Sequence, residues 1–152
     1  MIRGLALNLF CDMRILAFGS FDPLHEGHRD FLHQAKALGT HLTVVVAPNE
    51  AIATNKGYTP FSSLEDRIEA VKALKIADTV LPGTTTADPY QLLRDLAFDV
   101  IAIGYDQLPN DEIIRRELDV RGKQQVQILR LQPFHPEKYK SSFIRKGRSD
   151  SV

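Results

Sequence analysis

Two histidines in a glycine-containing segment are the residues of this chain best suited to chemistry. The segment reads Gly19-Ser-Phe-Asp-Pro-Leu-His-Glu-Gly-His28 and follows residues 14–18, an arginine and four apolar residues. His25 and His28 stand three residues apart, a spacing that brings two side chains to one face of a helix. The backbone N–H groups at a helix start favour an anion, and imidazoles add directed donors. The segment therefore predicts a phosphate-binding site, with Gly27 leaving room for the ligand's close approach.

A zinc site is the competing interpretation of the histidine pair. Zinc in proteins takes at least three protein ligands, and Cys11 is the only cysteine of the chain. The order His25-Glu-Gly-His28 also lacks the H-E-x-x-H spacing of zinc-dependent proteases. We therefore expect no metal ligands from the protein at this position.

A parallel sheet is expected to position the histidines. Short β-branched or aliphatic runs alternate with longer stretches of helical spacing, which is typical of βαβ units. Right-handed crossovers then predict a single Rossmann-like, doubly wound α/β domain with five parallel strands and helices on both faces. Ligands bind such sheets beyond the carboxyl ends of the strands. The expected strands are residues 14–18, 41–47, 79–81, 100–103 and 126–131.

Helix-start signals lie between these strands. One helix is expected to begin near Glu26 and run to residue 38, and another follows the capping serines 62 and 63. In Asp88-Pro-Tyr-Gln91, Asp88 is the expected N-cap and Pro89 the first helical residue. Residues 111–120 and 141–146 are the remaining expected helices. Lys56 is expected to lie in a loop that follows the second strand, and Arg67 in the helix after it.

The composition bounds the class of protein. The 152 residues suit one domain, and 19 basic residues balance 19 acidic ones, so no positive field favours nucleic acid. The apolar runs are too short to span a bilayer, and a lone cysteine fits a reducing cytoplasm. Residues 1–12 are expected to be an N-terminal extension, and residues 13–152 the domain.

The histidine segment resembles the G-x-F-D-x-x-H-x-G-H motif of the HIGH-motif nucleotidyltransferases, and every fixed position of that motif is present. The resemblance extends from residue 13 to about residue 148, and Lys56 and Arg67 match basic positions of the superfamily. It implies that His25, His28, Lys56 and Arg67 are catalytic, with Lys56 and Arg67 stabilising the pyrophosphate that leaves. It also implies nucleotide binding by six motif residues: Gly19, Ser20, Phe21, Asp22, Glu26 and Gly27. For the Asp22 carboxylate, three partners stay open: backbone, a metal ion or a histidine.

Two further segments refine the resemblance. Ile103-Gly-Tyr-Asp-Gln107 is similar to archaeal-type FAD synthases, which implies ATP as the donor, with Gly104 and Asp106 in the nucleotide site. Tyr139-Lys-Ser-Ser-Phe-Ile-Arg145 is similar to a signature that opens the last helix of the superfamily, although Tyr139 and Lys140 depart from it. The similarity implies that Ser141, Ser142 and Arg145 contact the triphosphate and that Tyr139 also lies in the nucleotide site.

The resemblance implies an adenylyl transfer from ATP to FMN, with Mg²⁺ or another divalent cation neutralising the triphosphate and a homodimer as the assembly. Three aromatic residues are candidates to stack on the flavin ring: Tyr58, Phe134 and Tyr139. The alternative within the same fold is a CTP-dependent cytidylyltransferase that acts on glycerol 3-phosphate or a similar phosphorylated molecule. A phosphopantetheine adenylyltransferase is more distant. A catalytically silent nucleotide-binding module is the rival from a different class.

Overall fold

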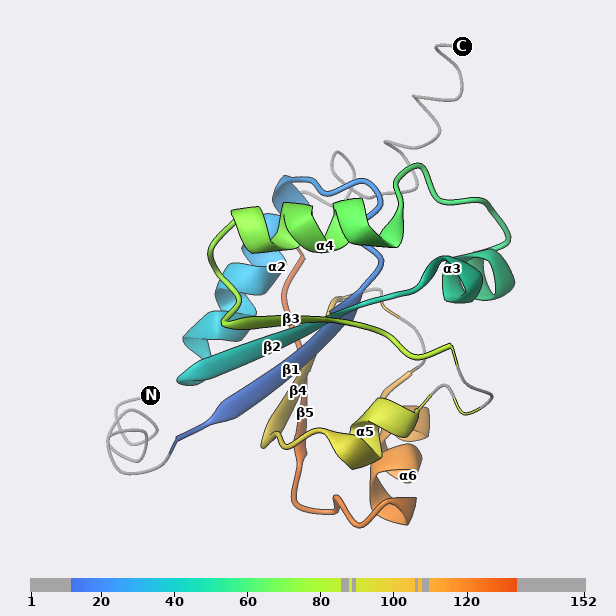
Figure 1. The fold of residues 1–152 in the computed structure, drawn as a ribbon. Helices are drawn as coiled ribbons and strands as arrows, with labels where there is room; N and C mark the ends of the chain where they lie inside the picture. The colour runs from blue at the N-terminus through green and yellow to red at the C-terminus, as the bar shows by residue number, and fades with distance from the viewer. Residues whose placement is uncertain (1–11, 86–87, 89, 106, 108–109, 134–152) are drawn as a thin grey trace.

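A five-stranded, all-parallel sheet forms the centre of the domain (Figure 1). The computed structural model describes residues 12–85, 88, 90–105, 107 and 110–133. The strand order is β3-β2-β1-β4-β5, which confirms the predicted doubly wound α/β fold. The strands are β1 (Arg14–Gly19), β2 (His41–Val46), β3 (Thr79–Pro82), β4 (Val100–Ile103) and β5 (Gln127–Arg130).

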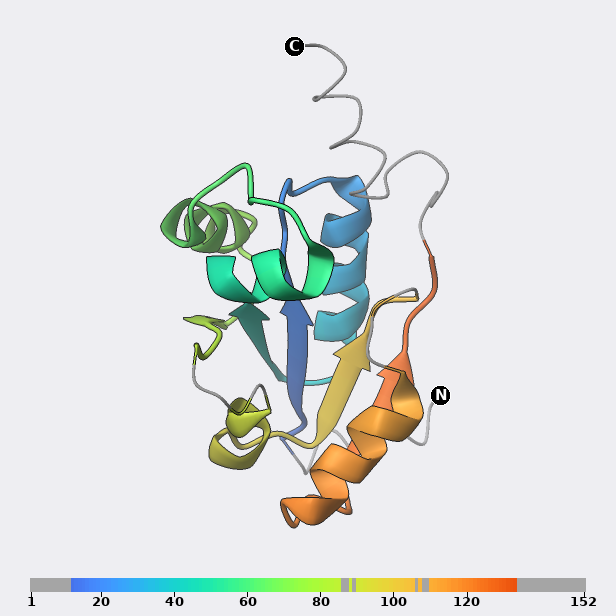
Figure 2. The same cartoon turned by 90° about the vertical axis from the view of Figure 1, so that its right-hand side faces the viewer.

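Helices cover both faces of the sheet, and one lies at its carboxyl end. Figures 1 and 2 show α2 and α4 on one face and α5 and α6 on the other, while α3 lies beyond the tips of the strands. The helices span α2 (Glu26–Ala37), α3 (Asn49–Lys56), α4 (Leu64–Ala73), α5 (Gln91–Asp95) and α6 (Asp111–Val120).

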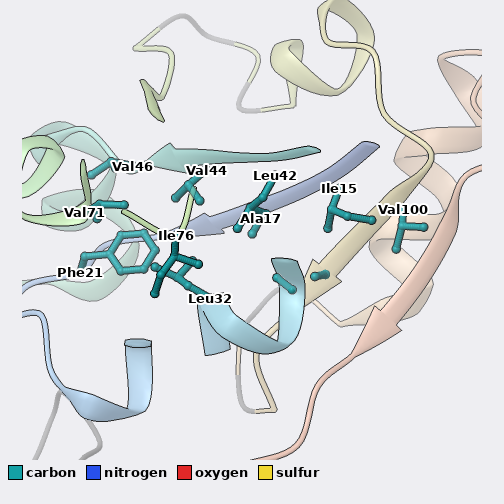
Figure 3. Close-up of a cluster of buried hydrophobic side chains, with 12 residues drawn as sticks. Ile15, Ala17, Phe21, Leu32, Leu42, Val44, Val46, Val71, Ile76 and Val100 are labelled. Atoms are coloured by element: carbon teal, nitrogen blue, oxygen red, sulfur yellow. The ribbon is translucent and has the colours of Figure 1, made fainter. Parts of the chain in front are cut away.

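The alternation of side chains along β1 divides the core into two layers. Ile15 and Ala17 pack in the cluster that includes Leu32 of α2 and Val71 of α4 (Figure 3). Leu16 points to the opposite face and packs with residues of α5 and α6. Because both faces of a parallel sheet are covered, β4 is buried along its whole length, as its continuously apolar sequence predicts.

Two helices differ from the sequence-based prediction. Residues 49–56 form α3, which ends at Gly57 in the left-handed conformation (φ 75°), where a loop was expected. Helix α5 begins at Gln91 with Tyr90 as its N-cap, so the expected N-cap Asp88 and first helical residue 89 precede the helix. The Asp88 carboxylate accepts a hydrogen bond from the Tyr90 N–H (2.9 Å) and forms a turn just before the helix. The helix predicted over residues 141–146 lies outside the described residues.

An ion pair joins β1 to the start of β4 at the amino edge of the sheet. The Asp99 carboxylate accepts hydrogen bonds from the Arg14 backbone N–H (2.9 Å) and from its guanidinium (3.0 Å). These contacts hold the pKa of Asp99 below its ordinary value, against the opposing effect of burial. A carboxyl whose pKa is lower in the folded state stabilises the fold above its unfolded pKa, and this stabilisation is lost as the pH falls through the folded pKa.

We predict that Asp99→Asn lowers the free energy of unfolding at pH 7 by about 1 kcal/mol, because the partly exposed carboxylate loses its charged hydrogen bonds. Urea unfolding at pH 7 and at pH values below the ordinary Asp pKa of 3.8 measures the effect. The deficit should shrink at the acidic end, where the wild-type carboxyl is protonated. Asp95→Asn, which removes an exposed carboxylate 3.5 Å from Arg94, is the control and should have little effect. A pH-independent deficit would contradict the prediction.

Candidate functional site

The candidate site lies where the strand order of the sheet reverses. Strand β1 pairs with β2 on one side and with β4 on the other, so the chain segments after β1 and β4 leave the carboxyl edge next to each other. The histidine segment follows β1, and Gly104 follows β4. This is the crevice in which doubly wound sheets bind their ligands. The predicted placement of the histidine segment beyond the first strand is therefore confirmed.

The two histidines themselves cap helix α2. His25 is the N-cap, with extended backbone, and its Nδ1 accepts a hydrogen bond from the Gly27 N–H (3.0 Å). In return, the His28 Nδ1 accepts a hydrogen bond from the His25 N–H (3.3 Å). This reciprocal pair is a capping box, which is usually built from serine or threonine and glutamate. The imidazole rings stack, with centroids 3.9 Å apart and an interplanar angle of 29°.

The capping bonds determine which nitrogen of each ring carries the proton. Since Nδ1 is the acceptor in both histidines, the neutral ring must carry its proton on Nε2. Burial lowers the pKa of His25 below its ordinary value, and the charge of Glu26 opposes this only in part. His25 is therefore a neutral Nε2–H donor near pH 7. Two such donors at the start of one helix can bind successive oxygens of an anion.

Phe21 packs against the histidine pair, and Gly19 leaves room for the Phe21 ring. Phe21 is buried, has a left-handed backbone (φ 54°) and meets the edge of the His28 ring with centroids 5.1 Å apart. A Cβ at position 19 would lie 2.6 Å from the Phe21 ring, so only glycine fits beneath it. Packing alone therefore accounts for the residue types at positions 19 and 21, without a contact to the nucleotide.

Asp22 ties the histidine segment to the loop before α4. Its side chain is buried, and the carboxylate accepts hydrogen bonds from the N–H groups of Phe61 (2.8 Å) and Ser62 (3.1 Å). Of the three partners that the sequence left open for Asp22, the structure shows the backbone. The carboxylate therefore orders two loops around the site.

Arg67 lies inside the protein, whereas a contact with the leaving phosphates was expected. Its relative exposure is 1%, and its guanidinium donates to the carbonyl oxygens of Ser20 (2.9 Å), Ala47 (2.7 Å) and Ser62 (3.2 Å), and to Asn49 Oδ1. Burial lowers its pKa, and the charge of Asp22 opposes the shift. Because these donors are bound to protein oxygens, the guanidinium joins the segments that surround the site. The structure gives Arg67 a positioning role.

At the end of β4, a glutamine bridges the two central strands. Gln107 Nε2 donates to the carbonyl oxygen of Phe18 (2.9 Å), and its Oε1 accepts from the Gly104 N–H (3.0 Å). Sequence reasoning assigned no role to this side chain. The available signal was its position three residues after Gly104, the glycine that follows the buried strand β4.

The other predicted site residues are placed as follows. Glu26 is exposed in the first turn of α2 and forms an ion pair with Arg29 (3.5 Å). Lys56 ends α3 instead of lying in a loop, and its side chain is outside the described part of the chain. Also outside that part are Asp106, Phe134, Tyr139, Ser141, Ser142 and Arg145.

The described residues contain no group of three or more histidine, cysteine or acidic side chains that could hold a metal ion. Among the helices of this described part, none is long and apolar enough to cross a bilayer.

We predict that Arg67→Met lowers the free energy of unfolding by about 3 kcal/mol or more, because three buried carbonyl oxygens lose their donor. Urea unfolding without ligand measures the change. Arg29→Met, which removes an exposed guanidinium from α2, is the control and should shift stability by less than about 0.5 kcal/mol. An Arg67 that served only to bind phosphate would instead give a variant as stable as the wild type.

Comparisons with known proteins identify the family of this chain. Residues 16–147 match the family described as Cytidylyltransferase-like. A FAD synthase from Thermococcus onnurineus is 43% identical over 72% of this chain and 73% of its own length. One from Thermococcus sibiricus is 34% identical over 90% of this chain and 88% of its own. One from Methanosarcina barkeri is 47% identical over 72% and 76%, respectively.

Solved structures share the fold. The crystal structure of a lipopolysaccharide core biosynthesis protein from Thermoplasma volcanium superposes with a TM-score of 0.75 at 31% identity and covers 82% of this chain and 99% of that one. A protein of unknown function from Archaeoglobus fulgidus, 22% identical, has a TM-score of 0.64 and covers 79% of this chain and 90% of its own. With the family match over most of its length and its capped histidine pair at the switch point of the sheet, this chain belongs to the cytidylyltransferase-like family.

Proposed function

We propose that the chain transfers the AMP moiety of ATP to the phosphate of FMN, giving FAD and pyrophosphate. The observation that carries the proposal is the stacked histidine pair, held by the backbone as two Nε2–H donors at the start of α2. Relatives named FAD synthase, at 34% to 47% identity, support the choice of ATP and FMN. So does the segment Ile103-Gly-Tyr-Asp-Gln107.

The reaction is a direct in-line displacement. A phosphate oxygen of FMN forms a bond to the α-phosphorus of ATP, and the bond from that phosphorus to the bridging oxygen of the β-phosphate breaks. The electron pair leaves with pyrophosphate. No protein nucleophile is needed because the attacking phosphate is already anionic, so the protein has only to orient the substrates and stabilise charge.

His25 and His28 perform the electrostatic part of this work. Their Nε2–H groups donate to oxygens of the α-phosphate and to the bridging oxygen, where negative charge develops as the bond breaks. Because the capping bonds already hold both rings in place, little reorganisation accompanies the reaction. Arg67 acts through the loops that it joins, without touching the substrate.

The remaining predicted residues complete the nucleotide site. Lys56 and Arg145, with the serines Ser141 and Ser142, contact the leaving pyrophosphate, and Asp106 and Tyr139 contact the rest of the nucleotide. Gly104 leaves room for a ligand to approach the backbone at the end of β4. It has no left-handed φ, and a Cβ there would meet Gln107 only at 3.7 Å, so the protein itself does not require glycine at this position.

Mg²⁺ enters as part of the ATP substrate. The described residues hold no acidic or histidine cluster for a resident metal, and the Asp22 carboxylate is bound to backbone N–H groups. The divalent cation is therefore carried by the phosphates. The proposed enzyme is homodimeric, as the resemblance implies, and cytoplasmic, in keeping with its single cysteine. Neither nucleic acid nor a membrane is a partner.

The second candidate reaction is cytidylyl transfer from CTP to glycerol 3-phosphate, which the description of the matched family favours. Pyrophosphate release separates the candidates when ATP and CTP are crossed with FMN, glycerol 3-phosphate and phosphopantetheine, and the products are identified by chromatography. FAD formed from ATP and FMN supports the proposal. CTP turnover with glycerol 3-phosphate would replace it, and nucleotide binding without turnover in any pair would favour a silent binding module.

We predict that His28→Asn lowers FAD formation by about 10²-fold or more, because the variant loses the Nε2–H donor. The asparagine amide keeps an oxygen that can accept from the His25 N–H, so thermal unfolding should stay near that of the wild type. His33→Asn changes an exposed histidine of the same helix and serves as the control. Equal turnover in the two variants would contradict the assigned role.

A further inference from the structure

An arginine on β5 holds the turn that follows β4. Arg130 Nη1 donates to the carbonyl oxygens of Gly104 (2.7 Å), Tyr105 (3.4 Å) and Gln107 (3.0 Å). Its Nε and Nη2 donate to Asp111 Oδ1 at the start of α6, at 3.1 and 2.6 Å. The planar guanidinium can make both sets of bonds at once, which a lysine ammonium cannot.

Gln107 holds the same turn from the other side. Its amide bridges the Gly104 N–H and the Phe18 carbonyl oxygen, and so spans the gap between the ends of β4 and β1. The turn is therefore bound to β1 through Gln107 and to β5 and α6 through Arg130. The backbone at residues 104, 105 and 107 is therefore held by contacts within the protein.

We propose that Arg130 and Gln107 are positioning residues for the nucleoside part of a nucleoside triphosphate. The inference rests on the proposed function, because it takes the turn after β4 as the nucleoside-binding element. Holding that turn in its binding conformation removes an ordering cost from nucleotide binding. The phosphates bind elsewhere, at the start of α2, so loss of the arginine weakens the affinity for ATP and leaves that for pyrophosphate unchanged.

The chain contains a matched control for Arg130. Arg115 also binds an acidic residue of α6, Asp119 (3.0 Å), and the carbonyl oxygens of Lys123 (2.9 Å), Gln124 (3.3 Å) and Val126 (2.6 Å). These carbonyls precede β5, at the amino edge of the sheet, whereas Arg130 acts at the carboxyl edge. Arg115 and Arg130 therefore bind the same kinds of group, a carboxylate and backbone carbonyls, but at opposite ends of β5.

Calorimetric titration of the full chain with MgATP and with magnesium pyrophosphate tests the inference, alongside thermal unfolding. Arg130→Met should raise the Kd for ATP about tenfold relative to Arg115→Met. This is the change expected if the turn adopts its binding conformation about a tenth of the time in the Arg130→Met variant. The two variants should lose similar stability, and pyrophosphate binding should be unchanged in both. Gln107→Leu, which leaves the Arg130–Asp111 pair intact, should weaken ATP binding in the same direction and replaces Arg130→Met if that variant does not fold.

Equal ATP affinity in Arg130→Met and Arg115→Met, or equal weakening of ATP and pyrophosphate in Arg130→Met, would overturn the inference. Wild-type protein that binds ATP but forms no FAD would overturn the proposed function and leave this inference to be judged on binding alone. Wild-type protein that binds no nucleotide would overturn both.

Discussion

The N–H groups at the start of α2 need acceptors, and in this protein two imidazoles supply them. His25 and His28 accept these N–H groups through Nδ1, so one set of bonds caps the helix and leaves each neutral ring with its proton on Nε2. The helix dipole and both donors then favour the same anion. The stability of the helix start and the chemistry of the site thus depend on the same two side chains.

Arginines with few exposed donors build the surroundings of this pair. Arg67 hydrogen-bonds to the segments after β1 and β2 and to the loop before α4. Arg130 hydrogen-bonds to the turn after β4. Each bonds mainly to backbone carbonyl oxygens, which irregular segments present in excess because they lack a regular ladder. A loop-built site can be rigid when its carbonyls converge on a guanidinium.

Strand and helix periodicity sufficed to predict much of this fold. The continuous apolar runs of β2 and β4 mark buried parallel strands, and His25 and His28 at the end of β1 locate the crevice. The predicted start of α4 was also confirmed, because Ser63 accepts from the Asp66 N–H. These features are local, and local patterns can be read from one sequence. Helix α3 was not predicted because it has little amphipathic character and starts after a proline without a side-chain cap.

The roles of Arg67 and Gln107 could not be predicted for a different reason. Arg67 contacts Asn49, Ala47 and Ser20, which lie 18 to 47 residues away in the sequence. Gln107 contacts Phe18, which lies 89 residues away. Tertiary packing therefore decides whether each side chain faces solvent, ligand or backbone. A basic residue at a family position suggested a phosphate contact, yet burial places Arg67 beneath the site. Asp88 likewise lies in a turn, and its carboxylate binds Arg121, which is 33 residues away.

The central claim is that the backbone holds both histidines as Nε2–H donors. Long-range ¹H–¹⁵N correlation spectra of the ligand-free protein, recorded above pH 7 and assigned with His25→Asn and His28→Asn variants, read the protonated nitrogen of each ring directly. The account predicts an unprotonated Nδ1 and a protonated Nε2 for both His25 and His28. A proton on Nδ1 of either ring would break its capping bond and contradict the account.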